Sequence, residues 1–406
     1  MTRTDVIILG GGLVGLALAS ALDHAGLQSI IVDPADPDTR RDAAFDGRTT
    51  AVSSSSMRMF GTIGVLDHLA GAGCPIEAIR VADGLQPGSL TFEPGEDGEP
   101  LGVMHENRHL RAALLARAEA ASHATLMWKR QVKEVVRDDH RATVRLADGE
   151  ELTAPLVIGA EGRQSPSREA AGIRMARWSY RHTAIVSTLA HDRPHEHVAY
   201  EIFYSTGPFA LLPMNDLEDG THRSAIVWSI ENDKAAGLLA LSDEAFAAEA
   251  QAAMGGFLGR IGLLTPRSSY PLGFHHAVRI TDRRLALVGD AAHAVHPIAG
   301  QGVNLGFRDA AALAEVLVDG ARLGLDLGDA QLLARYQRWR ALDAFSVALA
   351  TDGLTRLYGV PGKTASAVRR LGMGIVDRLP PLKARLNAAA RGNSGELPRL
   401  LLGETL

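Results

Sequence analysis

The feature that most restricts the fold of this chain is a cluster of glycines that begins at residue 10. Residues 5–9 form a short apolar run typical of a buried strand, and Gly10, Gly12 and Gly15 follow it with Gly-x-Gly-x-x-Gly spacing. Residues 13–25 are rich in alanine and leucine, and residues 29–33 are a second β-branched run that ends in an acid. This order predicts a strand, a tight turn, a helix and a parallel strand, which together make a βαβ unit.

Each glycine of this cluster has a physical role in binding a dinucleotide. Gly10 permits the tight turn, Gly12 lets the backbone approach a pyrophosphate, and Gly15 lets the helix pack closely on the strand. The helix N-terminus adds free N–H groups and a partial positive charge. Asp33 ends the second strand 18 residues after Gly15, where a carboxylate binds ribose hydroxyls. The pattern predicts an ADP-containing dinucleotide and leaves FAD and NAD as alternatives.

A second glycine-rich segment, residues 289–306, favours FAD. It follows the apolar residues 285–288, and its Gly289-Asp290 pair places an acid at a strand end, where it suits a sugar or ribityl hydroxyl. The turn at residues 300–302 precedes another helix, and its N–H groups suit the negative charge that develops on a reduced isoalloxazine ring.

Four stretches in this order resemble the class A flavoprotein monooxygenases, and specifically the ubiquinone-biosynthesis hydroxylases: residues 10–15, 46–51, 159–168 and 289–306. The closing segment 392–403 is similar to the C-terminus of that family. The resemblance implies an enzyme that holds FAD, uses NAD(P)H and O2 as co-substrates, and hydroxylates an aromatic ring through a C4a-hydroperoxyflavin. It implies a prenylated phenol as the substrate.

The resemblance also implies roles for individual residues. Asp290 would bind the ribityl chain, Arg48 would lie near the pyrophosphate, and Arg111 would be another cofactor contact. The motif at residues 159–168 serves both FAD and NAD(P)H in the family, but Glu161 stands where the family has an aspartate. The predicted cofactor-binding residues are Gly10, Gly12, Leu13, Val14, Gly15, Asp33, Arg48, Arg111, Glu161, Gly162, Gly289, Asp290, Pro297, Gly300, Gly302, Val303 and Asn304. Those predicted to act beside the reacting ring are Pro297, Gly300, Gln301 and Gly302.

The substrate side is predicted from the β-rich residues 178–272, which we expect to form a platform across from the flavin. Residues 199–213 alternate and then run apolar, as a pocket floor would. The predicted pocket residues are Tyr200, Phe203, Leu211 and Pro213. Residues 376–390 mix apolar and basic side chains, which suits contact with a membrane surface or a biosynthetic complex. A helix that packs on the core is the more common interpretation of such a pattern.

Composition and isolated residues exclude other classes. The formal net charge of −5 gives no basic stripe, so a nucleic-acid partner is not expected. No apolar stretch reaches the ~20 residues that span a bilayer, and no signal peptide precedes residue 5, so we expect a cytoplasmic protein. The single Cys74 and a lone dinucleotide fingerprint argue against a disulfide reductase. The isolated tryptophans argue against a flavin halogenase. His293 and His296 lack a third strong ligand, so no metal site is predicted.

The predicted fold class is α/β: a Rossmann-like FAD-binding domain with an inserted β-sheet substrate domain and a helical C-terminal region. The predicted ranges are 1–75, 103–177 and 273–340 for the FAD-binding domain, 76–102 and 178–272 for the substrate domain, and 341–406 for the helical region. Two other functions stay open. One is a FAD hydroxylase of a small soluble aromatic or secondary metabolite, and the other is a non-catalytic flavin-binding assembly component. The sequence leaves the oligomeric state unknown.

Overall fold

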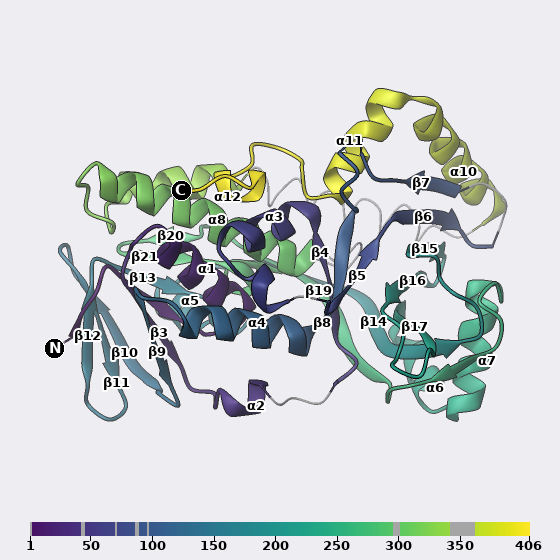
Figure 1. Cartoon of the computed structure of the whole chain (residues 1–406), viewed down its shortest axis with the longest axis horizontal. Helices are drawn as coiled ribbons and strands as arrows, with labels where there is room; N and C mark the ends of the chain where they lie inside the picture. The colour runs from purple at the N-terminus through teal and green to yellow at the C-terminus, as the bar shows by residue number, and fades with distance from the viewer. Residues whose placement is uncertain are drawn as a thin grey trace.

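The computed structural model describes residues 2–41, 45–69, 71–85, 89–95, 97–294, 301–341 and 362–406. Two large sheets lie at opposite ends of an elongated molecule (Figure 1). One is mainly parallel and is packed with helices, and the other is mainly antiparallel with helices on one face. This is the predicted α/β architecture.

The helices are α1 (Leu13–His24), α2 (Asp38–Arg41), α3 (Ser54–Thr62), α4 (Asn107–Glu119), α5 (Pro166–Ala170), α6 (Asn232–Leu239), α7 (Asp243–Met254), α8 (Gln301–Arg322), α10 (Lys363–Arg378), α11 (Pro380–Ala390) and α12 (Arg399–Leu402), with short 3-10 turns η1 (Leu66–His68) and η2 (Gly289–Ala291). The first strands are β1 (Thr2–Arg3), β2 (Val6–Leu9), β3 (Ser29–Asp33), β4 (Thr49–Ser53), β5 (Gly73–Ile76), β6 (Ala78–Asp83), β7 (Ser89–Phe92), β8 (Gly102–Glu106), β9 (Ala124–Trp128), β10 (Val132–Arg137) and β11 (Ala142–Leu146). The later strands are β12 (Glu151–Ala154), β13 (Leu156–Gly159), β14 (Met175–His191), β15 (Val198–Tyr204), β16 (Gly207–Met214), β17 (His222–Glu231), β18 (Ile261–Leu263), β19 (Ser268–Ala277), β20 (Thr281–Asp282), β21 (Leu285–Leu287) and β22 (His293–Ala294).

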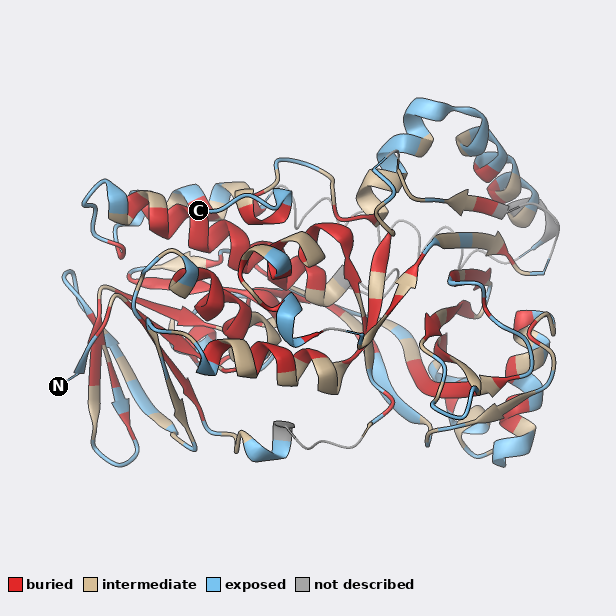
Figure 2. Cartoon of the chain, viewed as in Figure 1, coloured by how far each residue is buried: buried red, intermediate tan, exposed pale blue. Residues whose placement is uncertain are grey.

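The parallel sheet has the strand order β20-β21-β13-β2-β3-β9, and only its short edge strand β20 runs antiparallel. Strands β2 and β13 are buried along their whole length. Such strands read as continuous apolar runs because other elements cover both faces of a parallel sheet. Helices α1, α4 and α8 pack around it, and together they form the larger hydrophobic core, which is the continuous buried region in Figure 2.

The second sheet has the order β22-β19-β14-β17-β16-β15-β6-β7, with β18 paired to β14. Helices α6 and α7 cover one of its faces, where Ile202, Leu211, Trp228 and Phe246 belong to a separate hydrophobic core. Its other face is turned toward the small sheet β4-β8-β5, because Ala51 of β4 and Leu212 of β16 pack against the same buried clusters. The substrate-side sheet therefore has one purely structural face and one face directed at the rest of the molecule.

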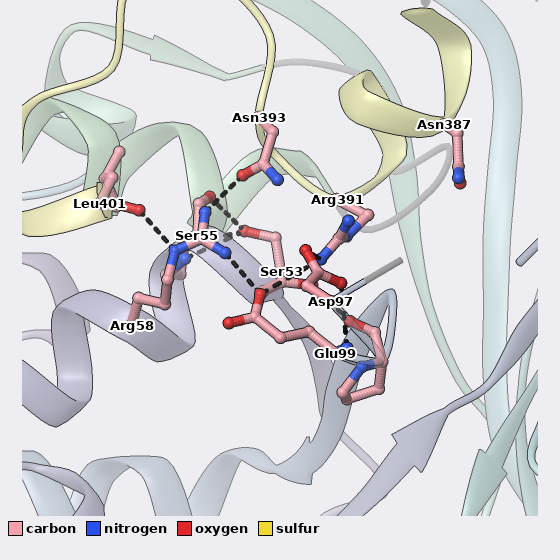
Figure 3. A network of polar contacts seen from close by, with 12 residues as sticks. Ser53, Ser55, Arg58, Asp97, Glu99, Asn387, Arg391, Asn393 and Leu401 are labelled. Carbon is pink, nitrogen blue, oxygen red and sulfur yellow. Dashed lines mark hydrogen bonds and ion pairs between the residues drawn. The ribbon is translucent and has the colours of Figure 1, made fainter. Parts of the chain in front are cut away.

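The C-terminal residues 391–401 are bound back onto α3 and β4 by a polar network (Figure 3). Arg58 of α3 donates to the Glu99 carboxylate at 2.6 Å, to the Asn393 side chain at 2.6 Å and to the Leu401 carbonyl at 2.9 Å. Arg391 donates to Asp97 at 2.6 Å. These contacts hold the C-terminal segment against α3 and the loop that carries Asp97 and Glu99, although these parts of the chain lie far apart in the sequence.

Candidate functional site

The predicted dinucleotide turn lies between β2 and α1, and packing requires glycine at Gly10 and Gly15. Gly10 has a φ of +107°, and a Cβ there would collide with the backbone of Ala160. A Cβ on Gly15 would collide with the Gly10 carbonyl oxygen. A Cβ on Gly12 would meet only open space, and no side chain caps α1. The first turn of α1, at Leu13 and Val14, is thus an open cradle with free N–H groups, which fits the pyrophosphate of FAD.

Asp33 lies at the end of β3 with its carboxylate turned back to this cradle. It accepts the Gly11 N–H at 2.6 Å and the Ala35 N–H at 2.8 Å, and its side chain is buried. These two bonds hold the carboxylate beside the glycine turn. That position suits the ribose hydroxyls of the predicted cofactor.

The second glycine segment is organised around Asp309 of α8, which is fully buried. Its carboxylate accepts the Gly289 N–H at 2.9 Å, His293 Nε2 at 2.6 Å and Arg340 Nε at 2.7 Å. Burial acts to raise the pKa of Asp309, but the charges and hydrogen bonds of His293 and Arg340 outweigh burial and lower the pKa. An ionised Asp309 therefore holds the turn that presents Asp290.

Asn304, in the first turns of α8, joins this segment to β4. Its side chain accepts the Ser53 N–H at 2.9 Å and donates to the Ala51 carbonyl at 2.7 Å. Gly302 and Val303 precede it in the same helix, whereas predicted residues Pro297 and Gly300 lie outside the described residues, as does the side chain of Gln301. Asn304 therefore positions the helix that follows the predicted flavin loop.

The motif at residues 159–168 packs against both glycine segments. Burial is the largest influence on Glu161 and raises its pKa, while the hydroxyls of Ser165 at 2.6 Å and Ser167 at 2.9 Å donate to its carboxylate. Gly162 follows it with a φ of +78°. The carboxylate that replaces the family's aspartate is thus directed into the N-terminus of α5.

Arginines of this motif connect it to Asp290. Arg163 donates to the Asp290 carboxylate at 3.2 Å, and the buried Arg168 donates to the Ala291 carbonyl at 3.1 Å. Arg48 and Arg111, predicted from separate parts of the chain, both approach the Asp46 carboxylate, at 3.9 and 3.7 Å. The structure therefore places these arginines in two groups, one at Asp290 and one at Asp46.

The four predicted pocket residues do not share one surface. Phe203 lies on the face of β15 that packs with Val81. Tyr200 and Leu211, which are opposite each other in register, pack with the core under α6 and α7. Pro213 shares the side of β16 that carries Leu211, because side chains alternate along a strand. Only Phe203 is on the face directed at the rest of the molecule.

A residue that the sequence did not single out lies on the same face as Phe203. Glu201 is two positions before it on β15 and is only 9% exposed. Burial raises the pKa of Glu201 to about 7. The only signal in the sequence was an acid inside an otherwise apolar strand, which is rare unless the acid is partnered.

The chain resembles known proteins along nearly its whole length. A family model described as FAD binding domain matches residues 3–348. The ubiquinone hydroxylase UbiL of Rhodospirillum rubrum is 44% identical over 405 residues, which cover 99% of this chain and 93% of that protein. The ubiquinone biosynthesis monooxygenase COQ6 of Xenopus tropicalis is 31% identical, with 95% of this chain and 93% of that protein covered.

Solved structures agree with this assignment at the level of the fold. The crystal structure of p-nitrophenol 4-monooxygenase PnpA from Pseudomonas putida has a TM-score of 0.79, covers 98% of this chain and 100% of its own, and is 16% identical. The matching family model and the relatives show a FAD-dependent monooxygenase of class A. Within that class, the chain belongs to the family of ubiquinone-biosynthesis hydroxylases.

Two other features are absent from the part of the chain that the structure describes. None of its helices is long and apolar enough to cross a bilayer. No group of three or more His, Cys, Asp or Glu side chains is arranged to hold a metal ion there. His293, considered above as a ligand, instead bonds to Asp309.

Proposed function

We propose that this protein hydroxylates the ring of a phenol that carries a polyprenyl tail, as a step in ubiquinone biosynthesis. The observation that carries the proposal is the identity of 44% along 99% of the chain to a ubiquinone hydroxylase, together with a cradle that fits FAD. When bound, FAD would take a hydride from NAD(P)H and activate O2 for transfer of one oxygen atom to the ring.

The residues of this chain hold and orient the groups that react. The first turn of α1 would bind the pyrophosphate, Asp33 the ribose and Asp290 the ribityl chain, with Arg48 and Arg111 as further cofactor contacts. The predicted loop residues Pro297, Gly300, Gln301 and Gly302 would lie against the flavin ring. The face of the second sheet that is directed at the rest of the molecule would exclude water from the reacting atoms. This exclusion would protect the activated oxygen from unproductive decay.

We also propose the predicted division of the chain. The five mutually parallel strands of the first sheet lie within ranges 1–75, 103–177 and 273–340, assigned to FAD binding. The pairing of β6 with β15 supports a substrate domain assembled from 76–102 and 178–272. The division implies that a substrate bound on the second sheet meets the cofactor at the boundary between the FAD-binding domain and the substrate domain.

The proposed substrate is a membrane lipid, and α10 and α11 present a surface that suits a membrane. Six apolar side chains, spaced three or four residues apart, are exposed on this hairpin: Val368, Leu371, Ile375, Leu379, Leu382 and Leu386. The opposite side of α10 is bound to the protein, since Arg369 donates to Asp83 at 3.0 Å. Figure 2 shows the hairpin as an exposed projection.

Charge favours an anionic membrane as the occupant of this surface. Residues 368–386 hold five Lys or Arg and one Asp, and Arg369 is paired with Asp83 on the protein-bound side, which leaves a net charge of 4 − 1 = +3 in a chain of net charge −5. Basic residues near an anionic bilayer contribute about 1 kcal/mol each. We therefore propose that this protein docks peripherally, on lipid of negative charge.

Flotation with vesicles of phosphatidylglycerol and phosphatidylcholine tests the docking surface. Wild-type protein should float with the anionic vesicles at low salt, and Leu371→Glu with Ile375→Glu should abolish this. Leu323→Glu, which alters an exposed leucine after α8, is the matched control and should float normally. Equal flotation of the double variant would exclude this surface and place the lipid contact elsewhere on the protein, and a wild type that does not float would indicate docking through a protein partner instead.

Mass spectrometry of quinones from a strain without this gene tests the proposed reaction. We expect a prenylated phenol that lacks one ring oxygen to accumulate, and its structure identifies the carbon. An unchanged quinone pool, in a strain with no second hydroxylase for the step, would overturn the proposal. Oxidation of NAD(P)H that only a small soluble phenol stimulates would indicate the soluble-aromatic alternative, and a protein that no phenol stimulates would indicate an assembly component.

A further inference from the structure

Glu201 lies on the face of the second sheet that is directed at the rest of the molecule. In register it stands opposite Ala210 of β16 on one side and Val81 of β6 on the other. Ala210 in turn stands opposite Val227 of β17. Residues in register share a face, so Glu201 is the one acid in a row of small apolar side chains.

The carboxylate of Glu201 has no partner in the described part of the chain, where neither a hydrogen bond nor an ion pair reaches it. Its burial alone raises its pKa, with no contribution from a neighbouring charge. Register brings one charged residue of β6, Asp83, to this face beside Glu201, and Asp83 is paired at 3.0 Å with Arg369 of α10. A buried, unpaired carboxyl is costly, so its place is explained best by a ligand that binds it.

The face that carries Glu201 is the face directed at the cofactor segments. Ala199, two residues earlier on β15, packs with Ala51, whose carbonyl accepts the Asn304 side chain. On β19, toward the other side of the sheet, Tyr270 lies on this same face by register. Burial raises the pKa of Tyr270, and the charges of Arg163 and Arg48 act on it in the opposite direction. Ala199 and Tyr270 of this face therefore both lie near residues of the predicted FAD site.

We propose that Glu201 binds the hydroxyl group of the substrate phenol and accepts its proton. In this step the phenol O–H bond breaks and an O–H bond forms on the Glu201 carboxylate, while the electron pair stays on the phenol oxygen. No atom is oxidised or reduced. The negative charge raises the electron density of the ring carbons ortho and para to that oxygen, which prepares them to attack an electrophilic oxygen. This inference rests on the proposed function and names the group that recognises the substrate.

The inference explains selection for a free ring hydroxyl within a mostly apolar surface. A hydrogen bond to a charged group is worth about 1.5–3 kcal/mol, so a phenol should bind at least about tenfold more tightly than its methyl ether. The apolar neighbours would contact the ring and the prenyl tail, and they would discriminate little between the phenol and its methyl ether. Glu201 is then the specificity-determining residue, and it is catalytic in that it touches the reacting substrate.

Binding of 2-farnesylphenol and of its methyl ether to the FAD-loaded protein, followed by the flavin absorbance spectrum, tests the recognition. In wild type the ratio of the two Kd values should be about tenfold or more. Glu201→Leu should reduce the ratio to about one, and Glu201→Gln, which keeps an acceptor without the charge, should fall between. Glu249→Gln, on the exposed side of α7, is the matched control and should keep the wild-type ratio.

Product yield tests the proton transfer. Both Glu201 variants should form hydroxylated product about 100-fold more slowly and release more H2O2 for each NAD(P)H consumed. Glu201→Asp should recover part of the rate. An unchanged Kd ratio, or a normal product yield in Glu201→Gln, would overturn the inference while leaving the proposed function intact. Failure of the wild type itself to hydroxylate the phenol would refute the proposed function instead.

Discussion

Replacing Glu201 by glutamine should stabilise the substrate-free protein, by an amount that increases with pH. Burial raises the pKa of this carboxyl from 4.5 to about 7. The folded state thus binds the proton more tightly than the unfolded state, and the wild type loses stability as pH rises through this interval. A pKa difference of one unit is worth about 1.4 kcal/mol. The raised pKa should therefore lower the unfolding free energy of the wild type by about 3 kcal/mol at about pH 8.5, and by under about 1 kcal/mol at about pH 5.

Urea unfolding of the FAD-loaded protein at about pH 5 and about pH 8.5 measures this effect. The difference in unfolding free energy between Glu201→Gln and wild type should grow by about 2–3 kcal/mol between the two conditions. All other titrating groups are common to both proteins and cancel, and Glu249→Gln should show no such growth. A difference that is the same at both pH values would mean that the carboxyl is solvated or partnered, and would refute the reasoning.

Three further perturbations test the cofactor segments and the hairpin. Asp309→Asn removes the charge that Arg340 faces in the core and should lower the unfolding free energy by about 3–5 kcal/mol and reduce the FAD content, measured by urea unfolding and flavin absorbance. Gly15→Ala should displace the glycine turn and give protein largely free of FAD, with circular dichroism close to wild type. Asp83→Asn leaves Arg369 buried without its ion pair and should speed protease cleavage of the α10–α11 hairpin, while unchanged cleavage would show that other contacts hold it.

The sequence signals for the cofactor half of the site are local, which is why a site could be predicted there from the sequence. Gly10, Gly12 and Gly15 act within one turn, and Asp33 is placed by the length of the βαβ unit alone. The bonds of Asn304 to Ser53 and Ala51 were beyond sequence reasoning, because they join residues about 250 positions apart. The local spacing of residues does not indicate which distant strand a helix will pack against.

The sequence signals for the substrate half are weaker, because both faces of its sheet are covered. Along β15 the side chains of both faces are mostly buried, so alternation of polar and apolar residues disappears. Tyr200 and Phe203 then look alike in the sequence, although they lie on opposite faces. The same loss of contrast hid Glu201, since an isolated acid in a strand usually marks a solvent-facing position.

The two halves of the site are mechanically joined at β22. The chain leaves the parallel sheet at β21, makes the turn of Gly289 and Asp290, and pairs with β19 of the other sheet as β22. The Asp309 carboxylate accepts hydrogen bonds from the Gly289 N–H and from His293 in β22. One carboxylate therefore holds both ends of the connection between β21 and β22. Since the predicted flavin loop begins directly after β22, its starting point is set by the substrate sheet as well as by the cofactor sheet. A change on either sheet that shifts β22 should therefore alter the coupling of NAD(P)H oxidation to hydroxylation before it alters FAD binding.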